Sequence, residues 1–178
     1  IASLKIVFGM LVPFIFALLL HEVIHLKFKR IVQTVVYLPH FMSWVILSGI
    51  LINMLSLEGI VNQIVQLFGG EPILFLQSNT WFRGVLVASD VWKEFGFNTI
   101  IYIAALTGIN PHLYEAAAID GANRFQRLIY ITIPGLLPTI ILLATLSLGN
   151  VLNAGFEQIL NLYNPIVYQS GDIIDTYV

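Results

Sequence analysis

The chain has 178 residues, of which 58% are hydrophobic and 10% are charged, with a formal net charge of -2 and a mean hydropathy of +0.88. A soluble globular domain has about 45–50% apolar and about 25% charged residues, so this chain lacks the polar side chains needed to cover a surface in water. The scattered basic residues exclude a nucleic-acid-binding surface, and the absence of Cys excludes disulfides and cysteine-based metal or thiol chemistry. The composition therefore predicts a protein embedded in a lipid bilayer.

Four apolar stretches are long enough to cross a bilayer as helices, because about 20 residues rising about 1.5 Å each span a hydrocarbon core of about 30 Å. We expect these spans at residues 2–20, 31–57, 82–106 and 128–154. Each apolar run is continuous and does not alternate with period two, which favours helices over barrel strands. The sequence thus predicts an all-α, polytopic transmembrane helical bundle forming a single domain. Its start inside an apolar run indicates a piece of a longer chain.

The connections between these spans differ in basic residues, which face the cytoplasm under the positive-inside rule. Basic residues occur in the turn at 21–30 and in the connection at 110–127, whereas the connection at 58–81 and the stretch at 155–178 have none. We therefore expect 110–127 inside the cell and 58–81 outside, as a loop that contains a short surface helix. Lys5 is the discordant charge, and we expect its long side chain to snorkel to the outer surface.

The cytoplasmic connection carries the pattern of a helix–turn–helix. Asn110 can cap a helix that begins at Pro111, because the N–H that proline lacks would be unpaired there. The alanines at 116–118 favour a helix with little side-chain bulk, and Gly121 can adopt the positive φ that ends it. We predict two short helices, here called the knob, whose small residues let another protein come close. The carboxylate of Glu115 is available to pair with a cation.

The same segment resembles the EAA loop of binding-protein-dependent ABC importer permeases, in which Glu-Ala-Ala is followed by Asp-Gly-Ala, an isoleucine and a proline. Shorter matches at 92–98 and 163–165 resemble carbohydrate-type permeases and the subgroup that imports complex oligosaccharides. Such permeases usually have six spans, so we expect the first and last spans to be missing here. The ATPase-coupling residues that the resemblance implies are Glu115, Ala116, Ala117, Asp120, Gly121, Ala122 and Pro134.

The resemblance implies a type I (MetI-like) permease core that does no covalent chemistry and needs no cofactor. In such an importer two permeases form an alternating-access path through the cell membrane. A cytoplasmic ATPase dimer holds both EAA loops, and an extracellular solute-binding protein delivers the sugar or oligosaccharide. We expect the second permease to be similar to this chain but not identical.

A competing interpretation rests on residues 21–25, His-Glu-Val-Ile-His, which fit the H-E-x-x-H pattern of zinc metalloproteases. In intramembrane proteases an Asp-Gly motif supplies a further ligand, and Asp120 with Gly121 fits that role. Against this, basic residues at 27–30 oppose a zinc ion, and histidines at a helix C-terminus are favoured by the macrodipole alone. We therefore expect His21 and His25 to be interface residues without a metal. A non-transport membrane scaffold is a third interpretation, which differs from an importer in lacking sugar-dependent ATPase coupling.

Charged side chains inside a span are costly and indicate function by default. The candidate substrate-path residues are Asp90, Lys93, Glu94, Asn150, Asn153 and Glu157. The first three follow the helical i, i+3, i+4 spacing, so Lys93 can pair with Asp90 in a structural network or line the sugar path. The last three lie on one helical face and suit either a hydroxyl-rich ligand or interhelical hydrogen bonds.

Overall fold

The structure, a computed structural model, describes residues 1–149, 155–171 and 173. Within these residues the regular structure is helical and contains no strand, so the all-α prediction is confirmed. The first half of the chain forms α1 (Ala2–His21), α2 (Leu26–Tyr37), the 3-10 turn η1 (Leu38–Phe41), α3 (Trp44–Leu55) and α4 (Ile60–Leu67). The second half forms α5 (Asn79–Thr107), α6 (Pro111–Ile119), α7 (Arg124–Arg127), the π turn η2 (Leu128–Thr132), α8 (Ile133–Gly149), α9 (Phe156–Leu162), the 3-10 turn η3 (Pro165–Val167) and α10 (Tyr168–Gly171).

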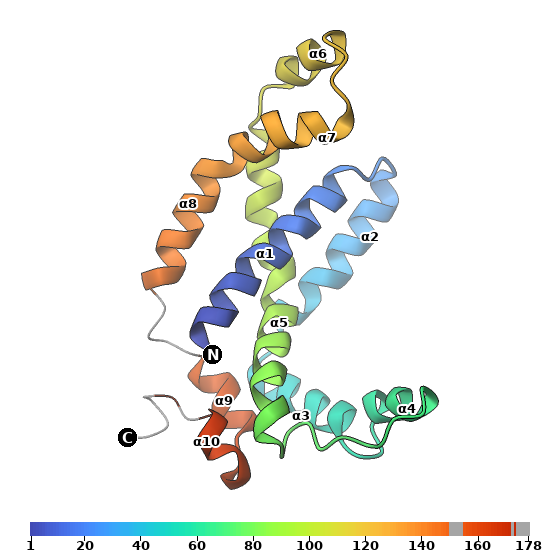
Figure 1. Cartoon of the computed structure of the whole chain (residues 1–178), viewed down its shortest axis with the longest axis vertical. Coiled ribbons are helices and arrows are strands. Elements are labelled where there is room, and N and C mark those ends of the chain that lie inside the picture. Colours follow the sequence, from blue (N-terminus) through green and yellow to red (C-terminus); the bar gives the residue numbers. More distant parts are fainter. Residues whose placement is uncertain (150–154, 172, 174–178) are drawn as a thin grey trace.

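The long helix α5 is the axis around which the other helices are arranged (Figure 1). It has 29 residues and is therefore about 43 Å long, and α1 packs along it. Tyr102 and Leu106, near its C-terminal end, form a buried cluster with α1 and α8. Phe82 and Leu86, near its N-terminal end, form a second buried cluster with α9 and η3. Because both clusters share α5, this helix holds together segments from both halves of the chain.

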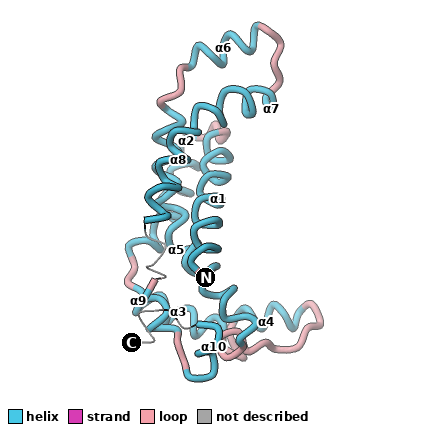
Figure 2. The backbone as a smooth tube through the Cα atoms, turned by 60° about the vertical axis from the view of Figure 1, so that its left-hand side comes forward, coloured by secondary structure: helices cyan, strands magenta, loops and turns pink. Residues whose placement is uncertain are grey.

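The two connections that the sequence assigns to opposite sides lie at opposite ends of the molecule (Figures 1 and 2). α6 and α7 stand at one end, whereas α3, α4, α9 and α10 gather at the other. The first turns of α2, with Lys27, Lys29 and Arg30, begin at the same end as α7. Glu58 and Glu71, on either side of α4, lie at the opposite end.

The predicted second span, 31–57, is not one helix. α2 gives way to η1, where Pro39 lacks the N–H that would continue the α-helical hydrogen bonds. Ser43 then caps α3, its hydroxyl accepting a hydrogen bond from the N–H of Ile46 at 3.4 Å. The prediction of a continuous helix is wrong on this point, because the hydropathy stays high across a break in the backbone.

Three helical stretches of the described chain are long and apolar enough to cross a membrane, namely Ala2–His21, Trp44–Leu67 and Arg124–Gly149. α5 is longer, but its four charged residues keep it out of this set, and its place in the bilayer as the span 82–106 stays a prediction. Two of these stretches overlap the expected spans 2–20 and 128–154, whereas the third joins α3 and α4 across the turn at 56–59 and overlaps the expected span 31–57 only through α3. Within Arg124–Gly149, only 11% of the most apolar 18-residue stretch is buried, so the surface of this helix is available to lipid or to other protein.

α2 and α5 come into close contact at Gly96. A Cβ added to Gly96 would lie 2.1 Å from the carbonyl oxygen of Val36, far inside contact distance. At Gly84, on the same helix, nothing lies within 4 Å of the corresponding position. Because glycine has no side chain, Gly96 allows α2 to pack against α5 at this point.

Candidate functional site

The knob predicted at 110–127 forms as α6, a turn and α7 at one end of the molecule (Figure 1). α6 begins after Asn110, whose side chain accepts a hydrogen bond from the N–H of His112 at 3.0 Å. Pro111 occupies the first helical position, where the missing N–H leaves no bond unmade. Two neighbouring residues therefore fix the start of α6, as the sequence predicts.

A Schellman motif ends α6 at Gly121, which has a φ of +79°. The N–H of Ala122 donates to the carbonyl of Ala117 at 2.8 Å, and the N–H of Gly121 donates to the carbonyl of Ala118 at 3.2 Å. Nothing lies within 4 Å of a Cβ built on Gly121. The glycine is therefore required by the left-handed backbone and not by crowding.

α7 begins with a capping box. The side chain of Asn123 accepts a hydrogen bond from the N–H of Gln126 at 2.8 Å, and the side chain of Gln126 accepts one from the N–H of Asn123 at 2.8 Å. Both sides of the turn are therefore closed by local bonds. The knob is a pre-formed unit that needs no partner to take its shape.

The outer surface of the knob is exposed, and no residue of α6 is buried. The Glu115 side chain is 69% exposed, and its Oε2 lies 3.0 Å from the Nδ1 of His112. Leu113, Ile119 and Phe125 are large apolar side chains exposed on the same unit. Six of the predicted coupling residues lie on α6 or in the turn that follows it: Glu115, Ala116, Ala117, Asp120, Gly121 and Ala122.

Two contacts that the sequence reasoning missed join the knob to the helices below it. The hydroxyl oxygens of Tyr114 and Thr132 lie 2.9 Å apart, and Thr132 is buried. At the end of α1, an oxygen of Glu22 lies 3.7 Å from a guanidinium nitrogen of Arg124. No local sequence pattern predicts either pair, because each joins segments that come together only when the chain folds.

The seventh predicted coupling residue, Pro134, lies below the knob in the first turn of α8. Just before it, the N–H of Ile133 donates to the carbonyl of Leu128, five residues earlier, which makes a π turn. Pro134 has no N–H for the carbonyl four residues before it, so it suits this local widening of the helix. A Cβ on the next residue, Gly135, would lie 2.8 Å from the side chain of Ile109. Pro134 therefore shapes the base of the knob and is not part of its tip.

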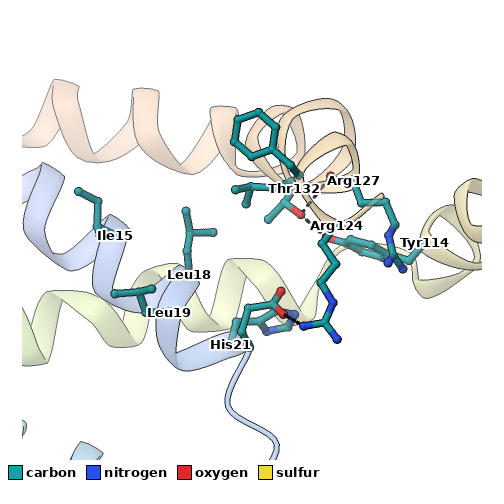
Figure 3. Close-up of a pocket in the computed structure, with 11 residues that line it drawn as sticks. Ile15, Leu18, Leu19, His21, Tyr114, Arg124, Arg127 and Thr132 are labelled. Atoms are coloured by element: carbon teal, nitrogen blue, oxygen red, sulfur yellow. Dashed lines mark hydrogen bonds and ion pairs between the residues drawn. The ribbon is translucent and has the colours of Figure 1, made fainter. Parts of the chain in front are cut away.

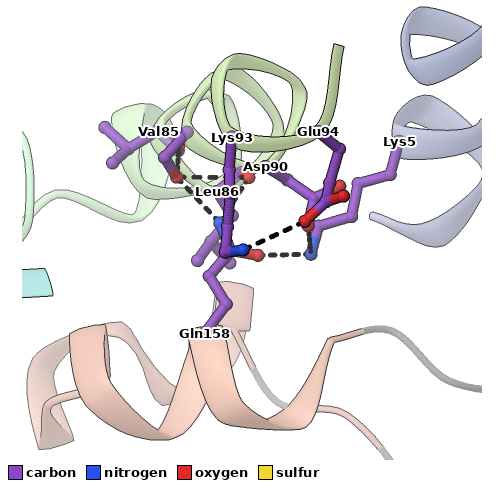
Figure 4. Close-up of polar contacts among 8 residues, drawn as sticks. Lys5, Val85, Leu86, Asp90, Lys93, Glu94 and Gln158 are labelled. Carbon is purple, nitrogen blue, oxygen red and sulfur yellow. Dashed lines mark hydrogen bonds and ion pairs between the residues drawn. The ribbon is translucent and has the colours of Figure 1, made fainter. Parts of the chain in front are cut away.

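Asp90 has a different partner from the one predicted (Figure 4). The sequence predicts a pair with Lys93, but Oδ1 of Asp90 lies 3.2 Å from Nζ of Lys5 on α1. Lys5 also donates to the side-chain oxygen of Gln158 on α9, and Gln158 donates to the hydroxyl of Ser89 at 2.7 Å. The predicted pair is wrong because packing brings a cation from another helix to Asp90. The resulting network ties α1, α5 and α9 together.

Lys5 does not snorkel, contrary to the sequence-based expectation. Its side chain is 8% exposed and points to the carboxylate of Asp90. A buried charge needs partners that offset its desolvation, and Asp90 and Gln158 supply them here.

Lys93 and Glu94 form a second polar group that holds η1 on α5. Nζ of Lys93 lies 3.2 Å from Oε1 of Glu94 and donates to the carbonyl of His40 at 2.8 Å. The other carboxylate oxygen of Glu94 lies 2.8 Å from Nδ1 of His40. The His40 ring also stacks on Phe97, with centroids 4.0 Å apart. These contacts support a structural role for Lys93, one of the two interpretations that the sequence leaves open.

Glu157 does not continue the helix of the fourth span. Asn150 and Asn153 lie outside the described residues. α8 ends at Gly149, and Glu157 belongs to α9, which begins after Gly155 with a φ of +87°. The prediction that Glu157 continues the face of the fourth span is therefore wrong, because a left-handed glycine precedes its helix.

His21 and His25 do not share a helical face. α1 ends at His21, and His25 precedes the first residue of α2, so the chain is not helical between them. The H-E-x-x-H motif needs a continuous helical turn to place both rings on one side. Glu22 lies beside Arg124, and no group of three metal-ligating side chains gathers among the described residues. The zinc-protease interpretation finds no support in this geometry.

These observations define a polytopic helical membrane domain with a protruding, self-capped helix–turn–helix at one end. Residues 5–162 match the family described as "Binding-protein-dependent transport system inner membrane component", and the chain belongs to this family. The family resemblance seen in the sequence is thereby confirmed, as is the membrane location.

Two proteins of Bacillus subtilis are similar to this chain over most of its length. The chain is 44% identical over 168 residues to the polygalacturonan/rhamnogalacturonan transport system permease protein YteP of Bacillus subtilis (strain 168), covering 94% of this chain and 52% of that protein. It is 42% identical to protein LplB of the same organism, over 100% of this chain and 56% of LplB. The chain thus spans about half the length of the curated relatives that it matches.

A solved structure is similar to this chain in both fold and sequence. It is described as a bacterial ABC transporter involved in the import of the acidic polysaccharide alginate, and it matches this chain with a TM-score of 0.94 at 43% identity. The match covers 99% of this chain and 62% of that one. The predicted permease fold is therefore confirmed for this chain.

Proposed function

We propose that this chain is the core of a permease subunit of an ATP-driven importer and forms the path by which a sugar or oligosaccharide crosses the cell membrane. Membership of the transport family supports the importer. The names of YteP and of the alginate transporter, both given for the transport of sugar polymers, support a complex carbohydrate as the substrate class.

The knob is the observation that carries this proposal. It is pre-formed, it stands at the end of the molecule, and it exposes Leu113, Ile119 and Phe125. Apolar side chains gathered on a protruding, self-capped unit favour contact with another protein. We assign that partner as a cytoplasmic ATPase dimer, so ATP is hydrolysed on the partner and this chain is not itself an enzyme.

Motion of the ATPase reaches the spans through the base of the knob. The bond between Tyr114 and Thr132 links α6 to the start of the fourth span, and Gly135 allows that span to pack closely on Ile109. A capped unit held in this way moves as a rigid body, and the helices below it rock around the substrate site.

The distribution of charge supports a cytoplasmic knob. Arg124 and Arg127 lie in the knob, and the basic first turns of α2 begin at the same end. The loop that carries α4 lies at the other end and has no basic residue between 58 and 81. Under the positive-inside rule, this asymmetry supports a position of α6 and α7 in the cytoplasm and of α4 outside.

The substrate path passes beside the polar network on α5. A cavity of about 200 Å³ there is lined by polar groups that include Lys5, Asp90, Glu94 and Asn98. The carboxylate of Glu94 lies against Lys93 and His40, but it is one-third exposed, more than Lys5 or Asp90, so it is the charged group of this cavity most open to sugar hydroxyls. Lys93 and Glu157 stay path residues by sequence prediction alone, as do Asn150 and Asn153, which lie outside the described residues. A second, similar permease closes the path, and an extracellular solute-binding protein supplies the sugar, as the alginate transporter's complex with a periplasmic protein suggests.

The test is Glu115→Lys, a charge reversal on the exposed knob, made in the full-length permease within its transporter. We expect normal insertion into the membrane, loss of the ATPase on purification, and loss of sugar-stimulated ATP hydrolysis and uptake, because like charges at an interface are strongly unfavourable. Glu71→Lys is the matched control, since it makes the same charge change in the loop at the opposite end. Retention of the ATPase and parental uptake by Glu115→Lys would overturn the assignment of the knob. A membrane scaffold differs in showing no sugar-dependent ATP hydrolysis even in the parent.

A further inference from the structure

A cavity of about 770 Å³ lies between the C-terminal end of α1 and the knob (Figure 3). One wall is apolar and consists of Ile15, Leu18 and Leu19 of α1, which share a helical face at i, i+3 and i+4 spacing. The far end is polar, where α1 finishes at His21 and the arginines of α7 approach. The cavity is thus amphipathic along its length, apolar toward the candidate span and cationic toward the knob.

The polar end has more cationic than anionic groups. Arg124 and Arg127 line it, and Glu22 is the carboxylate that faces them. Glu22 lies nearest Arg124, at 3.7 Å, which leaves Arg127 without this partner. Since each guanidinium is a planar fork of donors that suits phosphate oxygens, the two arginines facing the carboxylate of Glu22 give this end of the cavity a net positive charge that suits an anion.

We propose that the cavity binds an anionic phospholipid of the cytoplasmic leaflet, with its phosphate at Arg127 and Arg124 and an acyl chain along α1. The apolar wall argues for a lipid over a free phosphate, because Leu18 and Leu19 offer nothing to a small hydrophilic anion. These residues belong to a candidate membrane span, so they lie where acyl chains are available. Basic pockets beside membrane spans on the cytoplasmic side are the usual sites for anionic head groups.

Because of the position of the cavity, a bound lipid would contact both α1 and the knob. Its walls come from α1 on one side and from Tyr114, Phe125 and Thr132 of the knob and its base on the other. A bound lipid therefore bridges the membrane span and the knob at the place where Glu22 and Arg124 already meet. The assignment to the cytoplasmic leaflet rests on the proposed orientation of the knob, but the binding itself does not depend on the proposed transport, so either proposal can fail without the other.

The test reconstitutes the full-length permease, in its native complex, into nanodiscs of phosphatidylcholine with or without phosphatidylglycerol. Native mass spectrometry then counts the lipids that stay bound after release. We expect phosphatidylglycerol to be retained in preference to phosphatidylcholine, and Arg127→Gln to lower its retention about tenfold by removing a charge-assisted fork. Lys27→Gln is the matched control, because it removes one positive charge from the same end of the molecule outside the cavity.

A second variant acts in the opposite direction. Glu22→Gln removes the competing carboxylate and leaves both arginines in place, so we expect retention of phosphatidylglycerol to rise. Equal loss in Arg127→Gln and Lys27→Gln, or equal retention of the two lipids by the parent, would overturn the site. Displacement of the bound lipid by millimolar inorganic phosphate or glycerol phosphate would show a soluble-anion site and overturn the lipid assignment. A parent that retains no phosphatidylglycerol would also overturn the site.

Discussion

The hydroxyl groups of Tyr114 and Thr132, 18 positions apart in the sequence, meet at 2.9 Å and join α6 to the start of the last described long helix. Around this bond the knob is held by its own caps, so the hydroxyl pair and the nearby contact of Arg124 with Glu22 are its polar links to the helices below. A knob attached through so few side chains can be loosened without unfolding it. This makes its attachment separable, by mutation, from its shape.

The first prediction concerns this attachment. Tyr114→Phe removes one hydroxyl and should weaken the link by about 0.5–1.5 kcal/mol, the usual net contribution of a hydrogen bond. We expect the ATPase to remain bound, since the tip of the knob is unchanged, while sugar-stimulated ATP hydrolysis in proteoliposomes falls several-fold. Tyr130→Phe removes the hydroxyl of a neighbouring tyrosine that is 76% exposed, and it should behave like the parent. Equal rates in the two variants would exclude a role for the Tyr114–Thr132 bond in coupling.

Local signals account for what the sequence predicts correctly about the site. Asn110, Pro111 and Gly121 each act on the backbone within a few residues, so the ends of α6 could be derived without knowledge of the fold. The partner of Asp90 could not be derived from the sequence, because Lys5 lies 85 positions away and only the packing of α1 on α5 brings it near. The sequence offered the local cation Lys93 instead, which the fold uses for Glu94 and the carbonyl of His40.

The break between α2 and α3 has local sequence signals, but the sequence-based prediction still missed it. Its signals are local, namely Pro39 and the capping residue Ser43, but they stand inside an apolar run. Hydropathy measures how well a segment tolerates lipid and says nothing of where its backbone turns. Giving proline and a cap priority over the apolar run would have divided the span correctly.

The second prediction tests the close approach of α2 to α5. Gly96→Ala places a Cβ 2.1 Å from the carbonyl oxygen of Val36, so one of the two helices must shift. We expect the free energy of unfolding in detergent micelles to fall by about 1–3 kcal/mol, as for overpacked cores. Gly84→Ala, on the same helix but with open space around the new methyl, should be neutral or stabilise by up to about 1 kcal/mol through helix propensity. The idea fails if the two alanine variants unfold alike.

The third prediction concerns the pair of Lys5 and Asp90, whose side chains are 8% and 25% exposed. Lys5→Met and Asp90→Leu each leave a partner unpaired, so each should destabilise the protein more than the double variant does. We expect a coupling energy of about 1–3 kcal/mol from the double-mutant cycle, measured as unfolding free energy.

The exposed pair of Glu22 and Arg124 provides the comparison for this cycle. Its side chains are 66% and 83% exposed, and its oxygen and nitrogen are 3.7 Å apart. Such a pair is screened by water, so the corresponding cycle should give about 0–1 kcal/mol. If the coupling energy for Lys5 and Asp90 is as small as this, the buried pair does not hold α1 on α5 more strongly than an exposed ion pair would.

The last prediction separates backbone strain from crowding at the turn of the knob. Gly121 has a φ of +79° and open space where a side chain would begin, so any loss on substitution comes from the backbone. A residue with a Cβ pays about 1–2 kcal/mol in this conformation, whereas asparagine tolerates it better than most. Gly121→Val should therefore insert normally, because no span is changed, but release the ATPase and lose sugar-stimulated ATP hydrolysis. Gly121→Asn has a side chain of similar bulk and should keep most of both activities. If valine and asparagine act alike, the left-handed turn does not set the position of the knob, and the reason for a glycine at this place lies in direct contact with the partner.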